Sequence, residues 1–209
     1  MFVITADQID SRNDRDRAGE MIADLHAHFG AAFTLPPDQT SGDEIQVLIA
    51  DAGVVLACIM MLHRSGYWSI GVGIGEVRTP LPAATRQAAG SAFIAARQAV
   101  TRAKKTDAHV AIAMQHGEHA LLTVEQVEAL LTMLLLARQR RSDEGWEAVD
   151  LLENGLSQVD IAGALGISSA AVSQRVKAAQ FRVEQSARPA IVRLLENLDR
   201  SSSEMDTPL

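Results

Sequence analysis

Hydrophobic and polar positions follow two different patterns along the chain, and the change comes near residue 118. Before it, short apolar runs of strand type alternate with segments whose apolar residues recur every three or four positions. The strands expected from this pattern cover residues 2–9, 31–35, 44–50, 67–77 and 108–114. The helices expected between them cover residues 13–29, 52–64 and 83–104. Strands that alternate with helices indicate an α/β sandwich, which we place at residues 1–118.

Prolines and glycines add detail to this part of the chain. Pro36, Pro37 and the polar residues after them indicate a hairpin turn between the second and third strands. Gly71, Gly73 and Gly75 occupy every second position of the fourth strand. Glycines placed in this way favour close packing of a helix on the strand. No helix opens directly after them, so a dinucleotide-binding phosphate loop is not expected.

Only helical patterns follow residue 118. Thr123 and Gln126 predict a capping box at the start of one helix. A second helix has acids in its first turn and ends at Gly155, and two more helices and a long terminal one follow. We therefore expect an all-α region, a connector plus a DNA-binding domain, over residues 119–200. The short polar segment 201–209 predicts a disordered tail.

Composition places the chain among globular proteins of the cytoplasm. Its 209 residues, 47% of them apolar, suffice for one large or two small domains. No apolar run reaches the roughly 20 residues that cross a bilayer, and no basic region precedes the apolar N-terminus as in a signal peptide. The single cysteine, Cys58, lies in an apolar run and cannot form an internal disulfide. We expect no membrane partner.

The net charge of −7 argues against indiscriminate coating of nucleic acid. The charge is nevertheless uneven, because residues 138–200 hold nine basic and nine acidic side chains. The basic ones cluster at 138–141, 175–182 and 188–193. A neutral domain with local basic clusters can still neutralise a few phosphates.

The most specific motif is "LSQVDIAGALGISSAAVSQRVKAAQFR", residues 156–182. A serine begins each of two helices, a small residue permits their close crossing, a glycine suits a tight turn, and two apolar residues of the second helix face inward. These positions are Ser157, Ser168, Ala162, Gly166, Val172 and Val176. The pattern predicts a helix-turn-helix and resembles the DNA-binding regions of MarR-type regulators and sigma factors. The alternative is a plain helical hairpin in a bundle.

The resemblance implies that a recognition helix at about 168–182 enters the major groove of double-stranded DNA. Its outward side chains would meet base edges, and flanking polar or basic ones would meet phosphates. The first group is Ser169, Ala170, Ser173 and Gln174, and the second is Gln158, Lys177 and Arg182. Ser168, which caps the helix, is also counted among the DNA-binding residues. Because one such helix reads only a few base pairs, a homodimer on a two-fold site is expected.

Motifs in the first half point to another family. "ITADQIDSR", "SGDEIQVLI", "SIGVGIGEV" and "GSAFIAARQAV" occur in this order. Together they resemble the palm domain of class III nucleotide cyclases and GGDEF diguanylate cyclases, and more closely the SatD family. The resemblance implies a ferredoxin-like, nucleotide-cyclase-like sandwich. SatD-like domains joined to a C-terminal helix-turn-helix are a recurring bacterial arrangement.

The same resemblance implies a candidate site for Mg²⁺ and a nucleotide. In an active cyclase two carboxylates hold divalent cations that bind the triphosphate. Asp7 and Asp43 match those positions, Glu44 stands beside them, and Arg97 matches a donor to the reacting phosphate. The alternative is that these acids are solvated turn residues that the fold keeps near each other.

Three departures from the cyclase pattern argue against cyclisation. Phe93 occupies the position of an amide donor, and Asp10 replaces a glycine of the phosphate loop. A lysine that reads the base in many cyclases is also missing from "PPDQTSGD". We therefore expect a non-catalytic domain that senses a ligand or dimerises.

The sequence thus predicts a dimeric bacterial transcription regulator in the cytoplasm. Two alternatives belong to other classes. One is a nucleotide-binding or nucleotide-cyclising enzyme with a regulatory DNA domain. The other is an adaptor whose helical motif contacts RNA polymerase or a sigma factor.

Overall fold

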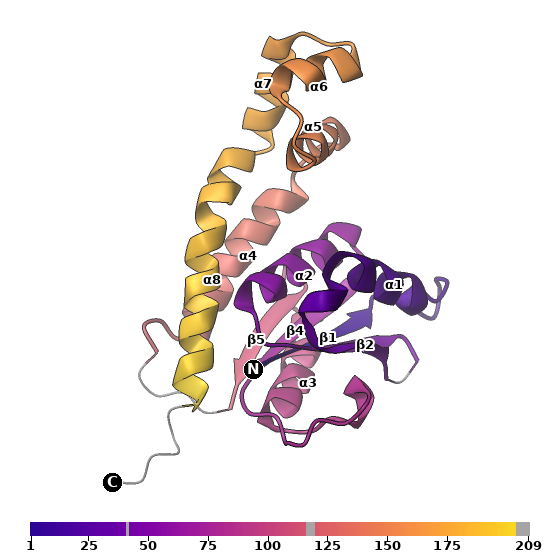
Figure 1. Cartoon of the computed structure of the whole chain (residues 1–209), viewed down its shortest axis with the longest axis vertical. Helices are drawn as coiled ribbons and strands as arrows, with labels where there is room; N and C mark the ends of the chain where they lie inside the picture. Colours follow the sequence, from indigo (N-terminus) through magenta and orange to yellow (C-terminus); the bar gives the residue numbers. More distant parts are fainter. Residues whose placement is uncertain (41, 116–119, 204–209) are drawn as a thin grey trace. The chain divides into compact units, whose positions relative to one another are not determined.

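The structure is a computed structural model that describes residues 1–40, 42–115 and 120–203 (Figure 1). Its contacts divide the chain into two compact units, Met1–Thr132 with Ile191–Leu209, and Met133–Ala190. The boundary predicted near residue 118 lies outside the described residues, and the contacts divide the chain within the next helix. Residues 201–203, predicted as part of a disordered tail, continue the last helix; residues 204–209 also lie outside the described part.

The first unit contains a mixed five-stranded sheet, which confirms the predicted α/β class. The strands are β1 (Phe2–Gln8), β2 (Phe33–Gln39), β3 (Glu44–Ile49), β4 (Trp68–Ile74) and β5 (Val110–Met114). Their order is β2-β3-β1-β4-β5. Strand β5 runs parallel to β4, and every other neighbouring pair is antiparallel.

The prediction of a turn at Pro36 and Pro37 is wrong, because both prolines lie inside β2. This strand is at the edge of the sheet, where a missing backbone N–H disrupts no ladder on the outer side. The pairing of β2 with β3 shifts register between Leu35 and Asp38, around the prolines. The edge position explains how two prolines fit a strand.

Three helices cover the two faces of the sheet. Helices α1 (Ala18–Phe29) and α2 (Ala52–Ser65) lie on one face and α3 (Ser91–Ala103) on the other (Figure 1). Gly71 and Gly73 of β4 face α3. A Cβ at Gly73 would lie 2.0 Å from the carbonyl oxygen of Ala92, and one at Gly71 would lie 2.2 Å from the Val100 nitrogen. The predicted close packing of a helix on these glycines is confirmed.

Two helices begin later than the sequence patterns predict. Helix α1 starts at Ala18 because the buried Gln8 side chain holds the preceding loop, donating to Arg15 O at 2.8 Å and accepting from Arg17 N at 3.0 Å. Helix α3 starts at Ser91, after a long loop with the 3-10 turn η2 (Thr85–Gln87). The buried Thr85 hydroxyl donates to Pro36 O at 2.6 Å and so ties this loop to β2.

The C-terminal region is all-helical, as predicted. It contains α4 (Val124–Gln139), α5 (Asp143–Glu153), α6 (Gln158–Leu165), α7 (Ser169–Ala178) and α8 (Phe181–Ser203). The predicted recognition helix is shorter than expected, since α7 ends at Ala178 and Gln180 adopts a left-handed φ of 54°. Arg182 therefore belongs to α8. Across the described ranges no helix is long and apolar enough to cross a membrane.

Candidate functional site

The start of α6 is closed by a reciprocal pair of hydrogen bonds. The Ser157 side chain accepts from Asp160 N, and the Asp160 carboxylate accepts from Ser157 N, both at 3.2 Å. This capping box satisfies two backbone donors that the first turn of a helix leaves unpaired. A short helix such as α6 depends on such ends because it has few internal hydrogen bonds.

A three-residue connection joins α6 to α7. Gly166 adopts the left-handed conformation at φ 63° and ψ 30°, and its N–H bonds to the carbonyls of Ala162 and Gly163. Ile167 N donates to Ala162 O at 3.1 Å. Ser168 then caps α7, because its Oγ accepts from Ala171 N at 3.2 Å. The local signals of the sequence therefore produce the expected helix ends.

The packing of α5, α6 and α7 determines which side of α7 remains outside. Val172 and Val176 of α7 are buried against residues of the other two helices. The buried core of this cluster consists of Ala148, Ile161, Ala162, Val172 and Val176. Because the two valines are one turn apart, their face of α7 is held inward, and the opposite face is left to solvent.

The predicted DNA-contacting side chains lie on that outer face or beside it. Those that the structure exposes are Ser168, Ser169, Ala170, Ser173, Gln174, Lys177 and Arg182. Gln158, at the first position of α6, is half-buried. The outward N-terminal half of α7 is thus short, polar and uncharged. Such side chains can approach base edges closely without steric conflict.

Cations flank this surface rather than fill it. Lys177 and Arg182 line a groove of about 350 Å³ at the junction of α7 and α8, together with the exposed Val183. Within the described residues neither forms an ion pair. Arg175 of α7, by contrast, is paired with Glu147 of α5 at 2.8 Å. Lys177 and Arg182 are therefore better placed than Arg175 to meet phosphates.

A buried ionic cluster lies next to the C-terminal end of α7. Glu184 of α8 forms ion pairs with Arg138, Arg141 and Arg188. Arg141 Nε also donates to Ala179 O at 2.7 Å, at the end of α7. Burial lowers the pKa of Arg138 to about 10, against the opposing charge of Glu184. Sequence analysis did not identify this cluster, because its members come from separate helices.

The first unit has a polar cleft of about 730 Å³ at the end of β1. It is lined by Asp7, Gln8, Ile9, Asp10, Ser11, Arg12, Asn13, Asp43, Ser69, Lys104 and His109. Asp7 and Asp43, which the sequence pairs by resemblance, are therefore brought to one cleft. Asp7 also lies opposite Glu44 in the antiparallel register of β1 and β3.

Two of the candidate acids are already paired with cations, one in α3 and one at its C-cap. Lys104 Nζ donates to Asp7 Oδ2 at 2.8 Å. Glu44 is buried, pairs with Arg97 at 2.9 Å and accepts from the Thr40 hydroxyl at 2.6 Å. Arg97, expected as a donor to a phosphate, is thus engaged with Glu44. These contacts satisfy the carboxylates without a ligand.

As they are arranged in the structure, the acids of this cleft do not form a metal centre. Among the residues that the structure describes, no three His, Cys, Asp or Glu side chains are grouped so that they could hold a metal ion. Asp10, at the position of the missing loop glycine, has a left-handed φ of 55° and accepts from Asn13 Nδ2 at 2.7 Å. Its carboxylate thus stabilises the turn after β1 and brings further negative charge to the cleft.

Lys104 and His109 are cleft residues that sequence analysis missed. Lys104 lies seven residues after Arg97, a spacing that places both on one face of a helix and could have revealed it. His109 has a left-handed φ of 50°, and its Nδ1 is buried without a hydrogen-bond partner in the described structure. No local pattern identifies His109, because its place depends on the pairing of β5 with β4.

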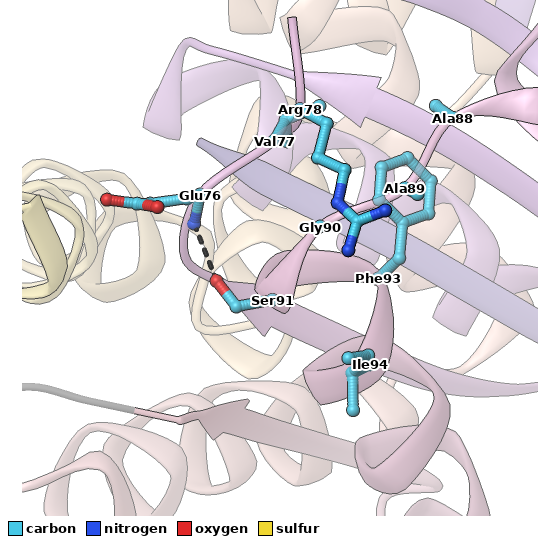
Figure 2. Close-up of a pocket in the computed structure, with 9 residues that line it drawn as sticks. All are labelled: Glu76, Val77, Arg78, Ala88, Ala89, Gly90, Ser91, Phe93 and Ile94. Carbon is cyan, nitrogen blue, oxygen red and sulfur yellow. Dashed lines mark hydrogen bonds between the residues drawn. The ribbon is translucent and has the colours of Figure 1, made fainter.

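Phe93 lies outside the Asp7 cleft. It lines a separate pocket of about 390 Å³ at the start of α3, with Arg78 and Ile94 among its neighbours (Figure 2). Glu76 N donates to Ser91 Oγ at 2.9 Å on one side of this pocket (Figure 2). Phe93 also packs against the core cluster that contains Val3 and Leu48. Its structural role is therefore apolar packing.

Comparison of the chain with protein-family models, curated proteins and solved structures found no match. The likeness to the SatD family thus rests on the sequence motifs.

Proposed function

We propose that the chain is a bacterial, cytoplasmic transcription regulator that binds double-stranded DNA through a helix-turn-helix formed by α6 and α7. One observation carries the proposal. The N-terminal half of α7 is exposed and uncharged, while Val172 and Val176 lock the opposite face into a core with α5 and α6. A rigid helix with an outward polar edge matches what insertion into the major groove requires.

The side chains of α7 support specific roles in this proposal. Gln174 can form two hydrogen bonds with an adenine edge, and Ser169 and Ser173 can bond to several bases. Ala170 can contact a thymine methyl group. Lys177 and Arg182 meet phosphates on the flank, as does Gln158. Two copies of the chain, bound as a dimer to half-sites about one helical turn apart, supply the affinity.

The topology of the first unit supports a further part of the proposal, a ferredoxin-like domain of the cyclase palm type. Strands β1–β4 with α1 and α2 follow the chain order βαββαβ, and the sheet order β2-β3-β1-β4 is antiparallel throughout. This order is the split βαβ arrangement of ferredoxin-like folds, to which α3 and β5 are added. The domain senses a ligand or dimerises and performs no cyclisation.

The test begins with selection of bound duplexes from a random pool, followed by fluorescence anisotropy with the selected site. The full chain should bind this duplex more tightly than an unrelated one. Gln174→Ala should weaken specific binding by about 5- to 100-fold and leave non-specific binding unchanged. Gln185→Ala, at an exposed position of α8, is the matched control and should change neither.

Lys177→Ala provides a second, independent readout. If Lys177 neutralises a phosphate, its loss weakens binding to all duplexes and reduces the dependence of log K on log salt by about one unit per half-site. Failure of the wild-type chain to select or retain any duplex at low salt would overturn the proposal.

A further inference from the structure

The cleft at the end of β1 holds a carboxylate that already has a cation. The Lys104 ammonium lies 2.8 Å from Asp7 Oδ2, and the two side chains come from positions 97 residues apart in the chain. Lys104 stands just after α3, at its C-cap position, and α3 itself packs closely on Gly71 of β4. The ion pair is therefore a product of the packed fold and not of a local turn.

A second ion pair repeats the arrangement one strand away. Arg97 pairs with Glu44 at 2.9 Å, and Glu44 is the register partner of Asp7 across β1 and β3. Two neighbouring carboxylates of the sheet are thus paired with two cations, one on α3 and one at its C-cap. Each carboxylate is neutralised by a side chain of the same chain.

We infer that Lys104 supplies the positive charge that the Asp7–Asp43 cleft would otherwise take from a divalent cation, so that the cleft is metal-independent. A hydrated Mg²⁺ needs carboxylate oxygens free of competing cations, in nearly octahedral geometry. Here an ammonium occupies Asp7 Oδ2, and a second positive charge beside it would be repelled. Glu44, held by Arg97 and Thr40, contributes no free carboxylate either.

The metal independence of this cleft does not depend on DNA binding, and substitution of Lys104 tests it. Lys104→Met removes the charge and keeps most of the length of the side chain. The variant leaves Asp7 without its resident cation, in a cleft that Asp43 and Asp10 also line. Without the ammonium, these side chains can turn toward a common divalent cation that no fixed positive charge repels.

The experiment is titration of the purified full chain with Mn²⁺, monitored by the electron paramagnetic resonance signal of the free ion. The wild-type chain should bind no Mn²⁺ with a Kd below about 1 mM. Lys104→Met should acquire a site at least about tenfold tighter than any in the wild type. Adding Asp7→Asn to Lys104→Met should remove that site.

Three controls keep the outcome interpretable. Lys105→Met removes a neighbouring exposed lysine and should leave Mn²⁺ binding as in the wild type. Lys104→Arg keeps a cation at the site and should also behave as the wild type. Circular dichroism melts establish that each variant is folded, and Lys104→Gln replaces Lys104→Met if the latter is not. Tight Mn²⁺ binding by the wild type that Asp7→Asn abolishes would overturn the inference, as would a folded Lys104→Met or Lys104→Gln chain that gains no site.

Discussion

Glu128 of α4 accepts a hydrogen bond from the backbone N–H of Ile112 in β5, with 2.7 Å between the nitrogen and Oε2. Strand β5 is at the edge of the sheet, so this amide has no strand partner on its outer side. The same carboxylate pairs with Arg102 of α3 at 2.7 Å. One side chain thus protects an exposed sheet edge and joins it to two helices.

Glu128→Ala should lower the free energy of unfolding by roughly 1–3 kcal/mol, because it leaves the Ile112 N–H without its acceptor and removes the carboxylate that pairs with Arg102. Urea denaturation followed by circular dichroism measures the loss. Glu196→Ala, at an exposed position of α8, should change the stability by less than about 0.5 kcal/mol. Equal effects of the two substitutions would contradict this role of Glu128.

Gly73→Ala tests the seating of α3 on β4. A Cβ at this position would lie 2.0 Å from Ala92 O and 2.3 Å from Ala96 N, and both are backbone atoms that cannot rotate away. We expect a loss of more than about 3 kcal/mol, or no folded first unit at all. Gly163→Ala is the contrast, since a Cβ in α6 meets nothing within 4 Å. It should stabilise the chain by about 0.5–1 kcal/mol. Thermal denaturation of the two variants and the wild type measures both effects.

The turn between α6 and α7 should depend on the left-handed conformation of Gly166 and not on space around it. No atom lies within 4 Å of a Cβ built there, but its φ is +63°. Gly166→Ala should therefore cost about 1–2 kcal/mol. Gly166→Asn should cost less, because asparagine adopts this conformation more readily. Hydrogen exchange of the amides of α6 and α7 would report the loss locally, and identical protection in both variants would argue against a conformational cause.

The ionic cluster around Glu184 should make the stability of the second unit fall in acid. Burial alone would raise the pKa of this carboxyl, but the charges of Arg138 and Arg141 and the hydrogen bond from Arg188 lower it below its usual 4.5. A folded-state pKa below the unfolded one adds stability that is fully present above about pH 4.5. That contribution is lost as the pH falls from this value through the lower folded-state pKa.

Glu184→Gln should remove this part of the acid dependence and destabilise the chain by roughly 3–5 kcal/mol at neutral pH. The reason is that the buried Arg138 and Arg141 lose their counter-ion, while Arg188 keeps only Glu153. Urea denaturation of the full chain at several pH values measures both effects. Glu196→Gln serves as the exposed control. An unchanged pH dependence in a folded Glu184→Gln chain would show that other groups govern acid unfolding.

Local signals in the sequence determined the elements of the second unit well. The serine caps, Gly166 and the spacing of Val172 and Val176 specify α6, its turn and the start of α7, because each acts within one or two helical turns. The alternation of strands and helices likewise predicted the α/β class of the first part. The glycines of β4 predicted that a helix packs closely on this strand. The end of α7, by contrast, was predicted four residues too late, because the residues around Gln180 have no local signal that ends a helix.

Tertiary structure decided the rest, because the partners are distant in the sequence. The buried Gln8 side chain delays α1, Thr85 holds the loop before α3 on β2, and the edge position of β2 admits two prolines. Asp7 and Asp43 could be paired from motifs, but the ion pair of Lys104 with Asp7 and the place of His109 could not be predicted in this way. The charge of a side chain can be read from the sequence. Its counter-ion depends on which helix packs on the sheet and on how that helix is positioned along the strands. That is why the candidate acids were found from the sequence and the cation that neutralises Asp7 only from the fold.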